Sequence, residues 1–130
     1  MENITVPNQL RQYGGGQQRA FVVTRKGNDR LLLRLEDIAC FFLQAKIAFA
    51  LTRDGKKYLL EENLTQLESM LDPHQFFRVS RQAIVSIHYI RRFRNFGRLR
   101  IEVELDVPVP YTVLTSQPAS ALFRKWIYNQ

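Results

Sequence analysis

The run Ile38-Ala39-Cys40-Phe41-Phe42-Leu43 decides the fold class of this chain, because it is apolar throughout. A short, continuous apolar run is typical of a strand that is buried on both faces. Cys40 is the only cysteine, which rules out a disulfide within the chain and a four-cysteine metal site. Within such a run, a lone cysteine is predicted to be a small buried hydrophobic residue.

Short strands with turns between them are predicted on both sides of this run. Asp54-Gly55 lies between apolar segments and is a good hairpin signal. Ala83–Ile90 fits either a short strand or a helical turn. The remaining apolar segments predict strands at Ala20–Arg25, Arg30–Leu35, Ile47–Thr52, Lys57–Leu60, Phe76–Val79, Tyr89–Arg94, Arg98–Leu105 and Tyr111–Thr115. Leu99, Ile101, Val103 and Leu105 alternate with polar residues, which predicts a half-buried antiparallel strand.

Two segments change to helical spacing. Leu64, Leu67 and Leu71 share one helical face, with Asn63 and Gln66 in a capping-box arrangement and Asp72-Pro73 as the stop. Near the C-terminus, Ser116 or Gln117 is predicted to cap a helix with Pro118 in its first turn. Its contacts with the sheet are assigned to Leu122, Trp126 and Ile127. The sequence therefore predicts a mainly β fold of about eight to ten short strands with one or two short helices.

The chain has 130 residues, which suits a single domain. Residues 1–18 contain Gly14-Gly15-Gly16 and no apolar periodicity, so they are predicted to be a flexible linker before a domain at residues 19–128. No signal peptide and no membrane-length apolar segment is found, which favours the cytoplasm. Lys and Arg number 19 against 12 Asp and Glu, giving a net charge of +7 and a pI near 10.0. Such a basic balance is compatible with binding nucleic acid.

Residue patterns for catalysis are missing from the sequence. His74 and His88 have no metal-ligand spacing, and the carboxylates are scattered rather than paired. The three consecutive glycines are not followed by Lys and Ser or Thr, as a phosphate-binding loop requires. We therefore predict no enzyme activity, no cofactor and no metal site.

Arginines crowd the stretch from Arg78 to Arg100. The planar guanidinium suits phosphate and guanine recognition because it donates two parallel hydrogen bonds. The Asn63–Leu71 helix, however, contains no Lys or Arg and is unsuited to the major groove. If the chain binds duplex DNA, loops and strand ends must make the contacts.

The order and spacing of several strings resemble the LytTR-type DNA-binding domain of bacterial response regulators. The most specific is Phe76-Phe77-Arg78-Val79-Ser80-Arg81-Gln82-Ala83-Ile84-Val85, and the resemblance covers about residues 19–127. Weaker matches are Phe21–Val23, Leu35–Ile38, Asp54–Tyr58, Leu64–Glu68, Gly97–Leu99 and Phe123–Trp126. The family implies an elongated antiparallel fold whose loops enter successive major grooves. It also implies a cytoplasmic transcription regulator that binds paired direct repeats as two copies, with a receiver or other sensor domain N-terminal to it.

By this resemblance, three segments are expected to face DNA: the loop at Gln44–Lys46, the Ser80–Gln82 segment and the residues before the last helix. The predicted contacts are Lys46, Ser80, Arg81, Gln82, Ser116 and Gln117, with Gln44 and Arg78 as candidate phosphate contacts. The chain departs from the family at Gln117, where arginine is usual. Glutamine can still read adenine, but it lacks the charge.

Other interpretations of these residues stay open. Arg78 could pair with Glu61 or Glu62 beside a core strand, and Arg100 could be an ordinary solvated strand residue. The domain could be a protein-interaction or dimerisation module that shares the fold. A single-stranded nucleic acid could bind a β surface, for which Tyr111 and Tyr128 are the candidate exposed aromatics.

Overall fold

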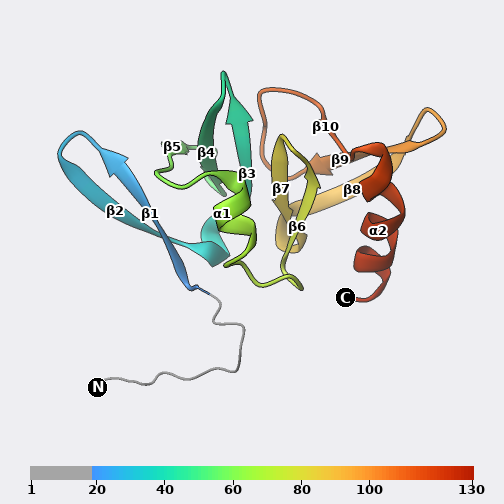
Figure 1. Cartoon of the computed structure of the whole chain (residues 1–130), viewed down its shortest axis with the longest axis horizontal. Coiled ribbons are helices and arrows are strands. Elements are labelled where there is room, and N and C mark those ends of the chain that lie inside the picture. The colour runs from blue at the N-terminus through green and yellow to red at the C-terminus, as the bar shows by residue number, and fades with distance from the viewer. Residues whose placement is uncertain (1–18) are drawn as a thin grey trace.

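The computed structural model describes residues 19–130, which form ten β-strands. Three antiparallel sheets follow one another along the long axis of the molecule, with a C-terminal helix at one end (Figure 1). The mainly β, elongated fold predicted from the sequence is confirmed. The predicted linker at residues 1–18 lies outside the described residues.

The sheets contain two, five and three strands. The first is the hairpin of β1 (Phe21–Lys26) and β2 (Asp29–Arg34). The central sheet has the order β5-β4-β3-β7-β6, with β3 at Ile38–Gln44, β4 at Ile47–Thr52, β5 at Lys57–Leu59, β6 at Phe76–Ser80 and β7 at Ala83–Ser86. The third has the order β10-β9-β8, with β8 at Ile90–Phe96, β9 at Arg100–Leu105 and β10 at Val113–Leu114.

The helices are α1 (Leu64–Glu68) and α2 (Gln117–Tyr128), and two short 3-10 turns cover Leu35–Asp37 and Ile87–Tyr89. The ambiguous Ala83–Ile90 segment thus contains both alternatives, a strand followed by a helical turn. The last predicted strand, Tyr111–Thr115, is shorter than expected, because only Val113 and Leu114 pair with β9 as a strand.

Strand β3 is buried on both faces, as its sequence predicts. Phe41 lies in a core that contains Leu64 and Leu67 of α1. Its neighbour Phe42 lies in a second core that contains Phe123 of α2. Burial also raises the pKa of the Cys40 thiol to about 12, in keeping with an unreactive core residue. The central sheet therefore separates two hydrophobic cores.

Helix α1 begins as predicted but ends early. Asn63 Oδ1 accepts from Gln66 N at 2.8 Å, and Gln66 Oε1 accepts from Asn63 N at 2.9 Å, which completes the capping box. The last helical residue is Glu68, although Asp72-Pro73 was predicted as the stop. Leu71 lies in the turn after α1 but is still buried in the core with Leu64 and Leu67. Its spacing from these residues therefore reflects core packing and not the length of the helix.

Helix α2 packs on the sheet through Phe123, which lies next to the predicted contact Leu122. Leu122 is 58% exposed, so its predicted contact with the sheet is wrong. Phe123 is fully buried. The centre of its ring lies 5.6 Å from that of Phe77 and 5.4 Å from that of Phe93. Trp126 and Ile127 pack against the same core as predicted. Residues at i, i+3 and i+4 share a helical face, and that face here starts at Phe123.

The turn between β8 and β9 corrects a second prediction. Ile101, Val103 and Leu105 are buried, but Leu99 is 56% exposed. It precedes the first residue of β9 and belongs to the turn, where Gly97 has a φ of 65°. The alternation of buried and exposed residues along β9 therefore starts at Ile101 and not at Leu99.

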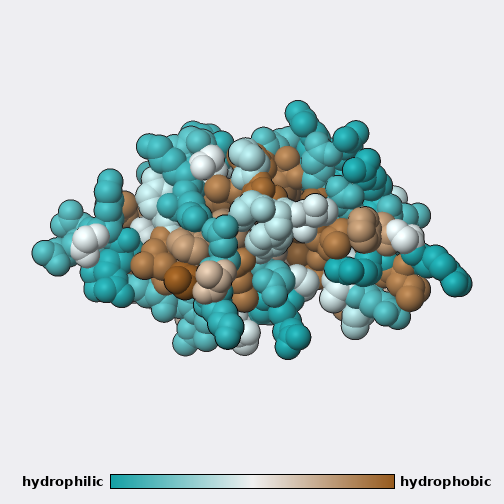
Figure 2. Space-filling model, turned by 90° about the horizontal axis from the view of Figure 1, so that it is seen from above, coloured by the Kyte–Doolittle hydropathy of each residue, from teal (hydrophilic) through white to brown (hydrophobic). Residues whose placement is uncertain are grey.

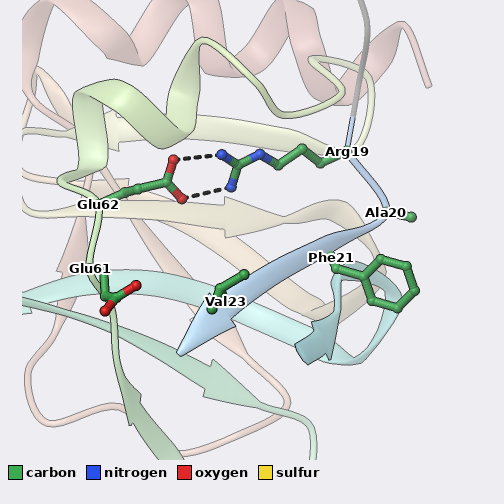
Figure 3. A pocket seen from close by; sticks show the side chains of 6 residues that line it. All are labelled: Arg19, Ala20, Phe21, Val23, Glu61 and Glu62. Carbon is green, nitrogen blue, oxygen red and sulfur yellow. Dashed lines mark hydrogen bonds and ion pairs between the residues drawn. The ribbon is translucent and has the colours of Figure 1, made fainter. Parts of the chain in front are cut away.

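An ion pair fixes the start of the described chain. The Arg19 guanidinium makes two hydrogen bonds of 2.6 Å with the Glu62 carboxylate (Figure 3). The Phe21 ring points away from this pair. Because Glu62 immediately precedes the α1 capping box, the pair joins the beginning of β1 to the α1 side of the central sheet.

The packing of α2 predicts unequal effects for adjacent substitutions. Phe123→Ala should lower the free energy of unfolding by about 3–5 kcal/mol, because it removes a fully buried aromatic ring. Leu122→Ala should change it by less than about 0.5 kcal/mol, because the side chain is mostly exposed. Denaturant unfolding of the two variants measures both values, and equal losses would contradict the observed orientation of α2.

Candidate nucleic-acid interface

Backbone hydrogen bonds bring the three predicted segments together at one end of the central sheet. Leu43 N donates to Gln82 O at 2.8 Å, which joins the end of β3 to the β6–β7 turn. Ser116 N donates to Val79 O at 2.7 Å, which holds the start of α2 against β6. In Figure 1 the two turns and the start of α2 all lie toward the top of the molecule.

Tyr111 connects these segments from the loop before β10. Its hydroxyl lies 3.0 Å from Leu43 O and 3.1 Å from Gln82 O, so it can donate to both carbonyls. Burial raises the pKa of Tyr111 to about 12, so the hydroxyl stays a donor even in alkaline solution near pH 10. With its hydroxyl engaged and its ring half-buried, Tyr111 is poorly placed for the base stacking considered above. A bridge between residues so distant in sequence leaves no local signal.

The β3–β4 turn has an unusual backbone. Ala45 and Lys46 have φ values of 53° and 67°, and Gln44 pairs with Ile47 across the turn. Two consecutive positive φ values define a type I′ hairpin turn, which normally uses Asn or Gly. Left-handed backbone costs a residue with a Cβ about 1–2 kcal/mol. Lys46 is thus an exposed cation held on a strained turn.

Gln44 is less available for phosphate than the sequence suggested. Its side-chain oxygen accepts a 3.0 Å hydrogen bond from Lys57 Nζ, on β5. The same ammonium lies 4.6 Å from the centre of the Phe49 ring. Lys57 was not among the predicted residues, because its position beside this turn follows from the pairing of β4 with β5.

The β6–β7 turn presents Arg81 and Gln82, both exposed. Ser80 pairs with Ala83 across the turn, and its hydroxyl accepts from Gln82 N at 2.9 Å. Ser80 is therefore half-buried and shapes the turn, whereas Arg81 is directed outward with no carboxylate partner among residues 19–130.

The Arg78 side chain makes hydrogen bonds to the backbone of this turn. Its Nε donates to Ser80 O at 2.8 Å and its Nη2 donates to Arg81 O at 3.2 Å. Its Nη1 donates to Glu68 at 3.1 Å and lies 3.3 Å from the Thr65 hydroxyl, both on α1. The guanidinium is thus engaged on all three nitrogens. Arg78 does pair with an acidic residue, as one interpretation proposed, but the partner is Glu68 and not Glu61 or Glu62.

The third segment, Ser116 and Gln117, is held in place by the start of α2. The Ser116 hydroxyl accepts from Ala119 N and caps the helix, and Gln117 is the first, exposed helical residue. An open groove of about 320 Å³ runs between this segment and the β6–β7 turn. It is lined by Ser80, Arg81, Gln82, Ala83, Arg100, Tyr111, Thr112, Val113, Leu114 and Ser116.

The surface around these turns is mixed in character. Figure 2 views the molecule from the side of these turns and shows hydrophilic residues around the rim with hydrophobic residues between them. Within residues 19–130, no three His, Cys, Asp or Glu side chains gather as a metal site. None of the helices in this range is long and apolar enough to cross a membrane.

These features define an elongated β domain in which two turns, carrying the exposed Lys46 and Arg81, and the start of α2 meet at one end of the central sheet. The family model described as the LytTr DNA-binding domain matches residues 28–128, and the chain belongs to this family. A similar solved structure is a LytTr DNA-binding domain from Bacillus cereus, described as part of a methyl-accepting/DNA response regulator. Its TM-score is 0.73 at 16% identity, with 84% of this chain and 97% of that chain covered. No curated protein matches.

The bonds of Arg78 predict a positioning role. Arg78→Lys keeps the charge but cannot make the forked contacts, so we expect a loss of about 1–2 kcal/mol in stability. DNA binding should weaken in both Arg78→Lys and Arg78→Gln without a change in the slope of log K against log salt. Unfolding and binding titrations measure these quantities. A slope flatter by about one unit in Arg78→Gln, with stability unchanged, would instead identify a phosphate contact.

The strained turn allows stability and binding to be separated. Lys46→Gly should be about 1 kcal/mol more stable than Lys46→Ala, because only glycine adopts positive φ without strain. Both variants should lose the same DNA affinity, because both lack the ammonium. Lys56→Ala, in the turn at the other end of β4, is the control of equal charge and should bind as wild type. A difference in affinity between the Gly and Ala variants would contradict a charge contact by Lys46.

Proposed function

We propose that this domain binds duplex DNA sequence-specifically through the β3–β4 turn, the β6–β7 turn and the residues at the start of α2. The observation that carries this proposal is that three segments distant in sequence converge on one end of the central sheet. Two of these segments carry the exposed cations Lys46 and Arg81. Arg81 can recognise guanine or phosphate, and Gln82 and Gln117 can recognise adenine. The Ser80 and Ser116 hydroxyls accept backbone hydrogen bonds that shape the interface, and each retains its O–H to donate to DNA.

The arrangement of the helices supports reading by turns. Leu64 and Leu67 of α1 are buried, and α1 contains no basic residue to meet phosphates. Helix α2 buries Phe123 against the sheets, and only its N-cap residue, Ser116, lines the groove. Neither helix is therefore arranged to lie along a major groove as a recognition helix does.

The family match supports a proposal for the wider biological role. We propose that residues 19–128 act as the non-catalytic output domain of a bacterial two-component transcription regulator in the cytoplasm. In this role a receiver domain precedes it, and two copies occupy paired direct repeats. The binding mode uses no metal and no cofactor. Arg19 lies before the start of the family match at residue 28, and its ion pair with Glu62 supports a domain boundary at Arg19.

A protein-interaction or dimerisation module is the second candidate. The outer face of the β1–β2 hairpin exposes Phe21 and Val23, and Leu32 opposite Val23 is 64% exposed. Uncharged Gln117 also weakens the third DNA segment. Such a module would keep the fold but bind no duplex.

Selection from a random duplex pool, followed by titration of the selected duplex, tests the proposal. Wild type should prefer the selected duplex over mixed-sequence duplex and over single strands. Arg81→Ala should weaken binding about tenfold or more, because it removes a bidentate contact. Arg53→Ala removes an exposed arginine of the β4–β5 turn and is the control of equal charge.

The outcomes separate the candidates. Equal binding by Arg81→Ala and Arg53→Ala would contradict the assigned interface. Failure of wild type to bind any duplex at low salt would favour the interaction module. A preference for single strands would favour base stacking on the β surface.

A further inference from the structure

Most arginines of the described chain are paired with a carboxylate. Ion pairs with N–O distances of at most 4.0 Å involve Arg19, Arg25, Arg30, Arg34, Arg53, Arg78, Arg91, Arg92 and Arg94. Within residues 19–130, the arginines outside this set are Arg81, Arg98, Arg100 and Arg124. Of these, Arg81 and Arg100 line the same groove. Two of the four arginines without a carboxylate partner among residues 19–130 therefore lie at the proposed interface.

The pairing of β8 with β9 explains why Arg100 differs from its neighbours. Across the two strands, Arg92 is opposite Glu104 and Arg94 is opposite Glu102, and both pairs form ion pairs. The next pair on that face joins Arg100 to Phe96. Arg100 thus stands on β9 where the pattern would supply an acid, and Phe96 stands on β8 where it would supply an arginine, so the cross-strand partner of Arg100 is an aromatic ring. The Arg100 guanidinium lies 6.0 Å from the centre of that ring, a contact that leaves its charge unneutralised.

One edge of the Arg100 guanidinium is held in place. Its Nε donates to Thr115 O at 3.1 Å, immediately before the Ser116 cap of α2. Among residues 19–130, its two Nη groups make no hydrogen bond. An oriented guanidinium with two unused donor groups is suited to an anion, because a phosphate accepts two parallel hydrogen bonds from it.

We infer that Arg100 is a further DNA contact, which binds a backbone phosphate beside the groove between the β6–β7 turn and the start of α2. It supplies the positive charge that Gln117 lacks in the third segment. This inference rests on the proposed function and adds a specific contact to it. The earlier interpretation of Arg100 as an ordinary solvated strand residue used only the alternation along β9, which cannot show that its cross-strand partner is Phe96.

Salt titration of the selected duplex with Arg100→Gln and Arg94→Gln tests the inference. The two variants lose the same charge from the same face of the same hairpin, but Arg94 is paired with Glu102. Arg100→Gln should flatten the slope of log K against log salt by about 0.9 and weaken binding about eightfold at about 0.1 M salt. Arg94→Gln should keep the wild-type slope. Arg100→Lys should restore the slope, because it retains a phosphate-binding charge.

The results distinguish this contact from the interface as a whole. If Arg81→Ala weakens binding while Arg100→Gln and Arg94→Gln behave alike, the Arg100 contact is overturned and the proposed function stands. If Arg100→Gln weakens binding without a change in slope, Arg100 positions the loop and the phosphate contact is overturned. Failure of wild type to bind any duplex would overturn both proposals. Unfolding curves of each variant show whether a loss of binding reflects a loss of structure.

Discussion

The burial of β3 on both faces is the constraint on which the rest of the structure depends. Phe41 and Phe42 are adjacent in sequence, yet each belongs to a different hydrophobic core, one shared with α1 and the other with α2. The β1–β2 hairpin attaches through the first core, and the β8–β10 sheet through the second. Because both cores use the same strand, the elements on either side are fixed relative to the turn that follows Gln44. The position of the proposed interface is thus a consequence of core packing.

The second determinant is the set of hydrogen bonds at that end of the sheet. Tyr111 approaches the carbonyls of Leu43 and Gln82, while Arg78 engages those of Ser80 and Arg81. These groups fix the backbone of the turns and leave the outward side chains to bind. A preorganised backbone loses less conformational entropy on association, so more of the contact energy contributes to affinity. The buried and exposed residues of these turns therefore divide structural and binding roles between them.

Local patterns in the sequence predicted the strands, turns and helix caps well. They predicted poorly which distant residues contact one another. The apolar run of β3, the Asp54-Gly55 hairpin and the capping box of α1 depend on neighbouring residues, and all are confirmed. The choice of Leu122 over Phe123 failed because the buried face of a helix depends on what packs against it. The Arg78–Glu68 pair and the Tyr111 bridge join distant segments, so no local spacing reveals them. The candidate contact segments came from resemblance to the family, and their convergence required the fold.

The two-residue length of the β3–β4 and β6–β7 turns has an evolutionary consequence. Their ends are fixed by the strand pairs Gln44–Ile47 and Ser80–Ala83, so the side chains at the tips contribute little to the cores. Exchanging a tip residue alters what the domain presents to a partner while the fold is retained. If these tips bind DNA as proposed, single substitutions at them can change the preferred site while the cores stay intact. The residues that maintain the fold and the residues at the turn tips can therefore evolve separately.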